Sequence, residues 1–130
     1  EYPWGAEWNP ARANANEGGI GRTTAVGMYP LGVPTPWPVL DLAGNVWEWC
    51  MNEQRTPANI GSDEDARLVV RGGAWHDESV YSRTFLRGGE GPSYSNYDTG
   101  FRVCRGSPPI ETLATASLAA EGRKPGPPQR

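Results

Sequence analysis

The sequence has little of several residue types that common functional classes require. Its 130 residues include one histidine and two cysteines, without the CxxC or Cys/His spacing that holds zinc. Lys124 is the single lysine, and the net charge of −3 comes from scattered charges of both signs, so there is no basic stripe for nucleic acid. No apolar run approaches the roughly 20 residues that span a bilayer. We therefore expect no zinc site, no nucleic-acid partner and no membrane span.

The residues that are abundant indicate a small, loop-rich folded domain. Glycine (17) and proline (13) are frequent, and six tryptophans and five tyrosines argue against disorder over most of the length. Composition predicts many turns held by an aromatic core. We place the domain at residues 1–106 and a tail at 107–130. Within the tail, Ile110 to Glu121 could form a weak helix, and the remainder is expected to be disordered.

Strand patterns are short and widely separated. The stretch 40–50 predicts a Gly44-Asn45 turn leading into a strand. The stretch 67–75 predicts a second strand, interrupted by two glycines, and 99–105 predicts a third. A further short strand is predicted within 23–30, whereas 51–66 and 88–98 are interpreted as polar loops.

Two carboxylates flank the Gly44-Asn45 turn. Asp41 and Glu48 are seven residues apart, and the turn between them offers backbone carbonyls. Calcium takes several oxygen ligands, which such a turn could supply. From spacing alone, a solvated turn with caps explains the same residues.

The only histidine, His76, lies beside Asp77 and Glu78. A histidine paired with a carboxylate could act as a general base, but no serine or cysteine is spaced to complete a nucleophilic triad. Adjacent residues of an extended segment also point to opposite faces. We interpret this stretch as an exposed polar loop that binds rather than reacts. The two cysteines, Cys50 and Cys104, could form one disulfide or be two buried thiols.

Tyrosine, serine, asparagine and glycine recur between residues 75 and 97. Adaptable binding loops use this composition, because tyrosine supplies rigid contact area and the small polar residues supply hydrogen bonds. We predict that His76, Tyr81, Tyr94 and Tyr97 share one exposed face. A surface loop whose tyrosines cover the core remains the alternative. The predicted ligand-binding residues are Trp75, His76, Asp77, Tyr81, Phe85, Tyr94, Asn96 and Tyr97.

Six motifs occur in a recognisable order: YPWG, RAN, GIGRT, DLAGNVWEWC, VVRGGAW and GFRVCR. Together they resemble the formylglycine-generating-enzyme family, also called the sulfatase-modifying-factor domain, from about residue 2 to 105. The resemblance implies an α+β, C-type-lectin-like fold with short antiparallel strands and long loops. It also implies calcium bound through Asp41, Gly44, Val46 and Glu48. A second family site would begin at the segment matching residues 14–15, but its acidic partner has no clear match.

The sequence also departs from the family pattern. Oxidase members carry a copper-binding cysteine pair after the RGG motif, and counting from Arg71 those positions hold Asp77 and Ser82. The resemblance therefore implies no catalytic residues here, and no copper or iron is expected from this chain. Family domains usually run about twice this length, so the chain resembles a C-terminal half. We expect it to require the N-terminal half as a partner.

Three functions fit these observations. The first is a non-catalytic ligand-binding domain of the diversity-generating-retroelement variable-protein type, which displays a variable surface between the RGG and GFR motifs. Its ligand would be a protein or small molecule of unknown identity. The second is the C-terminal part of an ergothioneine-type non-heme iron sulfoxide synthase. The third is an accessory domain of a kinase or surface protein.

Overall fold

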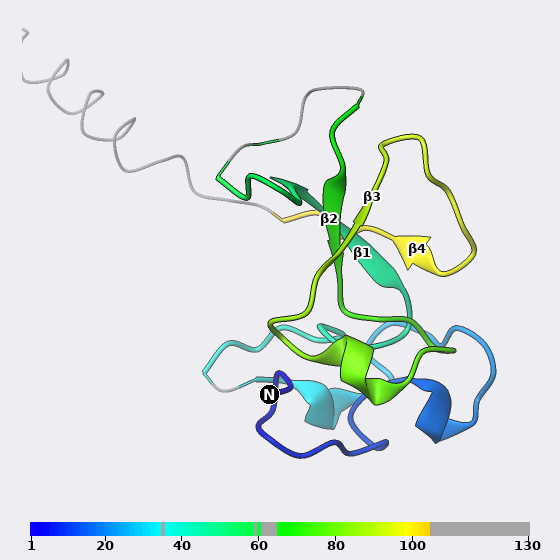
Figure 1. The fold of residues 1–130 in the computed structure, drawn as a ribbon. Coiled ribbons are helices and arrows are strands. Elements are labelled where there is room, and N and C mark those ends of the chain that lie inside the picture. The colour runs from blue at the N-terminus through cyan, green and yellow to red at the C-terminus, as the bar shows by residue number, and fades with distance from the viewer. Residues whose placement is uncertain (35, 59, 61–64, 105–130) are drawn as a thin grey trace, which may run out of the picture.

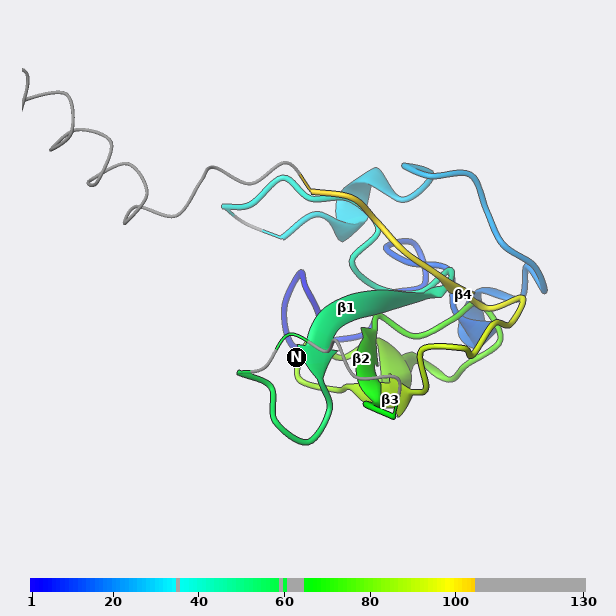
Figure 2. The ribbon, with the colours of Figure 1, turned by 90° about the horizontal axis from the view of Figure 1, so that it is seen from above.

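The computed structural model describes residues 1–34, 36–58, 60 and 65–104. Its four-stranded sheet has the order β3-β2-β1-β4 (Figure 1). The strands are β1 (Trp47–Glu53), β2 (Leu68–Arg71), β3 (Gly88–Glu90) and β4 (Thr99–Gly100). β1 pairs antiparallel with β2 and parallel with β4, while β2 pairs antiparallel with β3. Figure 2 shows β4 on one side of β1, with β2 and β3 on the other.

The strands predicted within 40–50 and 67–75 are confirmed in part. β1 begins at Trp47, after the Gly44-Asn45 turn, where both residues have positive φ (73° and 71°). It then continues to Glu53, so the assignment of residues 51–53 to a loop was wrong. β2 ends at Arg71, because the next two residues are glycines with φ of 99° and 73°, outside the strand region.

Three other sequence assignments need correction. Residues 88–90 form β3 instead of a loop, because they pair antiparallel with residues 68–70 of β2. Glycine has low strand propensity, so the pattern concealed this strand. The third predicted strand is reduced to Thr99–Gly100, and residues 101–104 are not extended into the sheet. No strand forms within 23–30, where the chain turns at Gly27 with a φ of 80°.

Turns and short 3-10 helices make up the N-terminal segment. The 3-10 helices of the described chain are η1 (Asn16–Gly18), η2 (Pro30–Gly32) and η3 (Ser79–Ser82). Figure 1 shows residues 1–34 and 36–46, in blue to cyan, gathered at one end of the sheet near η3. Aromatic rings contact one another within this segment: Tyr2 stacks on Trp4 with ring centroids 5.6 Å apart and meets Trp8 at 5.2 Å. The predicted helix at Ile110 to Glu121 lies outside the described residues.

The buried core consists mainly of small side chains. Its apolar members are Tyr2, Ala13, Ala15, Ala43, Val69, Val70 and Ala74. The prediction of an aromatic core was therefore wrong, because Tyr2 is the only aromatic residue buried in the described part of the chain and the tryptophans are half-buried or exposed. None of the helices in the described part of the chain is long and apolar enough to cross a membrane.

Candidate functional site

Main-chain bonds fix the turn from which the predicted binding segment starts. Gly44 donates its N–H to the Gly72 carbonyl at 2.8 Å, and Asn45 donates to the Asn14 carbonyl at 2.8 Å. The Asn45 carbonyl in turn accepts from the Trp75 N–H at 3.0 Å. Because these bonds join three distant parts of the chain, the residues after Gly72 leave the sheet in a defined direction.

Three aromatic side chains from both ends of this segment meet. Trp75 and His76 are edge to face with ring centroids 5.0 Å apart, and Tyr97 contacts both, at 6.2 and 5.6 Å. We call Trp75, His76 and Tyr97 the ring cluster. Tyr97 is 69% exposed, so the cluster reaches the protein surface. The sequence predicted that His76, Tyr81, Tyr94 and Tyr97 share one exposed face. Of these four residues, the structure brings His76 and Tyr97 into ring contact.

Two carboxylates flank the imidazole of the ring cluster. The His76 Nε2 atom lies 3.0 Å from the Asp98 Oδ2 atom, and His76 Nδ1 lies 3.4 Å from Asp77 Oδ1. Asp77 is itself fixed, because its Oδ2 atom accepts from the Trp47 indole N–H at 2.8 Å and from the Ala74 N–H at 2.9 Å. Asp98 is only 8% exposed. The acids therefore hold the imidazole ring in place from two sides.

The remaining predicted binding residues lie around the cluster in smaller groups. Asn96 donates to the Tyr94 hydroxyl at 2.8 Å and accepts from the Tyr97 N–H at 2.9 Å, so it links the two tyrosines. Tyr81 packs edge-on against Trp47 at 6.4 Å. Phe85 is exposed and takes part in none of the ring contacts given for the described residues.

Sequence reasoning missed two residues that support the site. Asp98 was assigned to a polar loop, and Trp47 was interpreted only as a strand residue. The available signal for Asp98 was its position directly before the strand that ends the segment, where a side chain could turn back toward His76. Nothing in the local pattern indicated that the Trp47 indole would reach Asp77, because 30 residues separate them.

A second polar cluster joins residues on both sides of the Gly44-Asn45 turn. Arg102 donates to both carboxylate oxygens of Glu48, each at 2.5 Å. It also donates to the carbonyls of Leu40 at 2.9 Å and Asp41 at 2.6 Å. These hydrogen bonds to Glu48 raise the pKa of the Arg102 guanidinium above its ordinary value. A planar fork of donors thus ties β1 to the loop before it and to the chain after β4.

Residues 1–107 match the family described as the sulfatase-modifying factor enzyme 1-like domain. The chain belongs to this family. Among curated relatives, this sulfatase-modifying factor domain is 31% identical over 125 residues to inactive C-alpha-formylglycine-generating enzyme 2 of Bos taurus, covering 85% of this chain and 40% of the relative. It is 32% identical over 114 residues to the serine/threonine-protein kinase pkn1 of Chlamydia pneumoniae, covering 80% of this chain and 17% of the kinase.

Two solved structures resemble the fold. Variable protein 1 of Treponema denticola superposes with a TM-score of 0.59 at 24% identity, over 70% of this chain and 34% of the other. PvdO of Pseudomonas aeruginosa superposes with a TM-score of 0.58 at 27% identity, over 78% of this chain and 42% of the other. These matches confirm the predicted fold class, an α+β, C-type-lectin-like domain with short strands and many loops.

In this sulfatase-modifying factor domain, Asp77 and Ser82 stand at the positions where the oxidase cysteine pair is expected. Asp77 is hydrogen-bonded as described, and Ser82 is 2% exposed, with no hydrogen-bond partner for its hydroxyl among the described residues. Ser82 packs on Gly73, where an added Cβ would lie 3.0 Å from its Oγ atom. Neither side chain can supply a thiolate. The actual cysteines are both free: Cys104 is exposed, and burial raises the pKa of the half-buried Cys50 thiol.

Calcium binding through Asp41, Gly44, Val46 and Glu48 stays a prediction, and the arrangement of these residues does not favour it. Arg102 engages both Glu48 oxygens, and Asp41 Oδ2 accepts from the Gly27 N–H at 2.7 Å. Calcium needs six to eight oxygen ligands at one point. As arranged, the two acids serve different partners, so the residues do not fit the ion unless Arg102 moves away.

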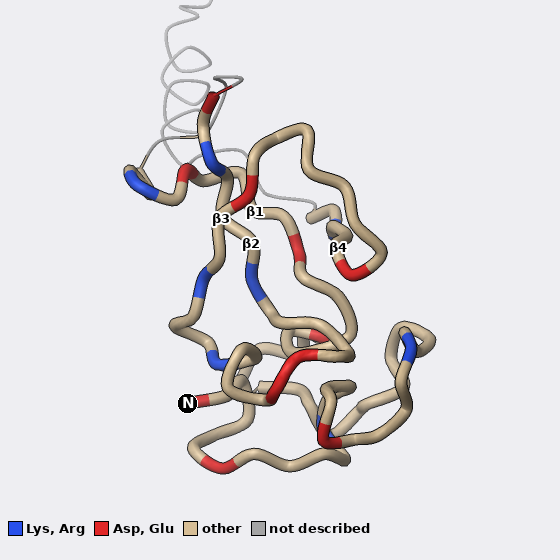
Figure 3. Tube along the Cα trace, turned by 45° about the vertical axis from the view of Figure 1, so that its right-hand side comes forward, with Lys and Arg blue, Asp and Glu red and all other residues tan. Residues whose placement is uncertain are grey.

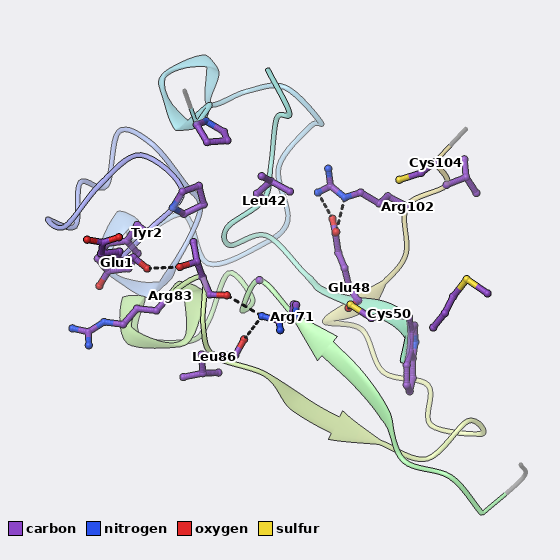
Figure 4. Close-up of a pocket in the computed structure, with 17 residues that line it drawn as sticks. Glu1, Tyr2, Leu42, Glu48, Cys50, Arg71, Arg83, Leu86, Arg102 and Cys104 are labelled. Carbon is purple, nitrogen blue, oxygen red and sulfur yellow. Dashed lines mark hydrogen bonds and ion pairs between the residues drawn. The ribbon is translucent and has the colours of Figure 1, made fainter. Parts of the chain in front are cut away.

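A cavity of about 910 Å³ lies beside the Glu48–Arg102 pair, and Figure 4 shows the residues around it. Both cysteines line it, together with apolar side chains that include Leu42, Met51 and Val103. None of the predicted ligand-binding residues lines this cavity. The domain therefore carries two separate surfaces, the ring cluster and the cavity.

Proposed function

We propose that this chain is a non-catalytic ligand-binding domain on a C-type-lectin-like scaffold. In this proposal the ligand contacts the ring cluster and the neighbouring Tyr94 and Asn96. These residues belong to the segment between the RGG and GFR motifs, which variable proteins of diversity-generating retroelements use for display. Aromatic rings with small polar neighbours provide contact area and adaptable hydrogen bonds without catalytic groups.

The observation that carries the proposal is the exposed junction of Trp75, His76 and Tyr97 at a place where the family's reactive thiols are missing. Aromatic residues from both ends of the segment meet at the surface, with ring centroids between 5.0 and 6.2 Å apart. Asp77 and Ser82 cannot replace the cysteine pair in copper-dependent oxidation. The fold shared with a protein called variable protein 1 agrees with a display role.

A second candidate is an accessory domain that mediates protein contact within a larger protein. The kinases of Chlamydia support it, because the matched region is 17% of the pkn1 chain of Chlamydia pneumoniae. In that case the surface between residues 73 and 98 would have one fixed partner. The two candidates differ in whether this surface is diversified, not in whether it binds.

The proposal includes a second contact, at the cavity. The chain spans 40% of the bovine relative and 34–42% of the two similar structures, and the cavity wall is partly apolar. We infer that the cavity packs against the remainder of a longer domain. Peroxide oxidation of methionine tests this contact, with Met51 in the cavity wall and exposed Met28 outside it. In the product of the whole reading frame we expect protection of Met51 alone, and equal oxidation of both would contradict the contact.

The test of the display function is the DNA around the gene. A near-copy of the codons for Arg71 to Arg105 that differs at adenines, beside a reverse transcriptase gene, would support a diversified binding domain. The differing codons should include those of His76, Tyr94 and Tyr97. Finding no such copy would reject diversification and favour the accessory domain.

A further inference from the structure

The two carboxylates beside the ring cluster carry more negative charge than His76 can balance. Asp77 and Asp98 both face the single imidazole of His76, one on each ring nitrogen. Within the described part of the chain, no lysine or arginine forms an ion pair with either acid. Two carboxylates therefore share one group that carries at most one positive charge. Figure 3 shows acidic positions, in red, beside β4 and in the loop after β2.

Aromatic faces lie directly beside this charge. Tyr97 contacts Trp75 and His76 and is 69% exposed, so its ring is accessible to a ligand. The face of a tryptophan or tyrosine ring carries negative electrostatic potential and attracts cations. Ring faces and partly buried carboxylates thus both favour a positively charged ligand and disfavour an anion.

We propose that the ring cluster recognises a cationic side chain, an arginine or lysine on a protein ligand. The inference rests on the proposed binding function and specifies its ligand class. A protein side chain is favoured because the cavity found next to the Glu48–Arg102 pair does not include these residues, and the cluster presents an open surface. A guanidinium stacks on the Tyr97 and Trp75 rings while its charge is attracted by Asp98 and Asp77.

The arrangement also explains why the acids are fixed so firmly. Asp77 accepts from the Trp47 indole and the Ala74 N–H, and Asp98 accepts from the Thr99 hydroxyl at 3.1 Å. Carboxylates that are held in this way attract a cation without having to be ordered on binding. Preorganised groups of this kind lose less entropy when a ligand arrives.

Nuclear magnetic resonance with two small probes tests the inference. N-acetyl-arginine amide and its neutral isostere N-acetyl-citrulline amide have nearly the same shape but differ in charge. We expect the arginine probe to shift the Trp75 indole signal at low salt, with about fivefold weaker binding of the citrulline probe. The exposed Trp37 indole, remote in sequence, is the internal reference and should not shift.

Two aromatic variants locate the contact. Tyr97→Ala should weaken arginine binding about threefold, the range of an exposed cation–π contact. Trp37→Ala removes a comparably exposed ring that belongs neither to the ring cluster nor to the proposed ligand contact, and it should leave binding unchanged. Both side chains are exposed, so both variants are expected to fold.

Each outcome has a defined meaning. Selective binding of the arginine probe that depends on Tyr97 supports the inference. Equal binding of both probes overturns the charge preference while the display function stands. Absence of binding by either probe also overturns the cationic ligand class, and the genomic search then decides the display function independently.

Discussion

The contact between Gly44 and Asn14 gives the sharpest test of the fold, because it holds the start of the binding segment. Gly44 has a φ of 73°, and an added Cβ would collide with the Asn14 carbonyl oxygen and lie 2.8 Å from the carbonyl carbon. A left-handed conformation costs an ordinary residue about 1–2 kcal/mol. Overpacking against backbone that cannot rotate away costs about 1–3 kcal/mol more. We expect Gly44→Ala to lower the free energy of unfolding by roughly 3 kcal/mol.

Gly19→Ala is the matched control. Gly19 has a similar φ of 66°, but an added Cβ would have no heavy atom within 4 Å. The control should therefore lose only the conformational part, about 1 kcal/mol. The two variants share the left-handed backbone conformation, and only in Gly44→Ala does the added Cβ collide with the Asn14 backbone.

Urea denaturation followed by tryptophan fluorescence measures both losses. The midpoint should fall much further for Gly44→Ala than for Gly19→Ala, while the slope m stays the same because a similar surface is exposed. A difference of this size is a large part of the stability of a small domain. Equal losses in the two variants would refute the argument, since the Asn14 contact would then contribute nothing.

Other predictions concern the polar clusters and the thiols. Arg102→Met removes two hydrogen bonds to a carboxylate and should lower the unfolding free energy by about 2 kcal/mol in urea titrations. Arg102 is hydrogen-bonded to both carboxylate oxygens of Glu48. The melting temperature of the parent protein should therefore be the same in calcium as in a chelator, and a higher melting temperature in calcium would favour the predicted calcium site. Iodoacetamide should modify exposed Cys104 before Cys50, whose pKa burial raises, and mass spectrometry after brief exposure gives the order. Partial burial acts to raise the pKa of Glu17, but hydrogen bonds from Ser79 hold it below its ordinary value. The stability that Glu17 contributes is thus present above its unfolded-state pKa and is lost as the pH falls through its folded-state pKa. In melting curves recorded across this pH range, Glu17→Gln should not show this decrease in melting temperature.

Local pattern was sufficient for the elements that depend on nearest neighbours. The Gly44-Asn45 turn followed by Trp47 predicted the start of β1, and the pattern of residues 67–75 predicted β2, in which Val69 and Val70 are buried. Side-chain preference decides such elements, so their residues could be read directly. The family motifs supplied the fold class, which no short stretch could have provided.

Elements that depend on distant contacts were not predictable in this way. β3 contains Gly88 and Gly89, which have poor strand propensity, and it forms because glycine lets the chain pass close to Val70 and Gln54. The ring cluster was foreseen as a set of exposed residues, but its acid partner Asp98 was not. Its position depends on a parallel pairing between β1 and β4 across a long connection.

The attachment of the segment between β2 and β4 has a consequence for protein engineering. At one end Gly72 accepts from the Gly44 N–H, and at the other the Asp98 carbonyl accepts from the Trp47 N–H at 2.7 Å. Both anchors are main-chain atoms, which are the same whatever side chains the segment carries. The tip around residues 93–96 could therefore be replaced by foreign peptides, with insertion length limited by loop-closure entropy, which grows only slowly. A small domain of this kind would serve as a grafting frame whose two attachment points are independent of the inserted sequence.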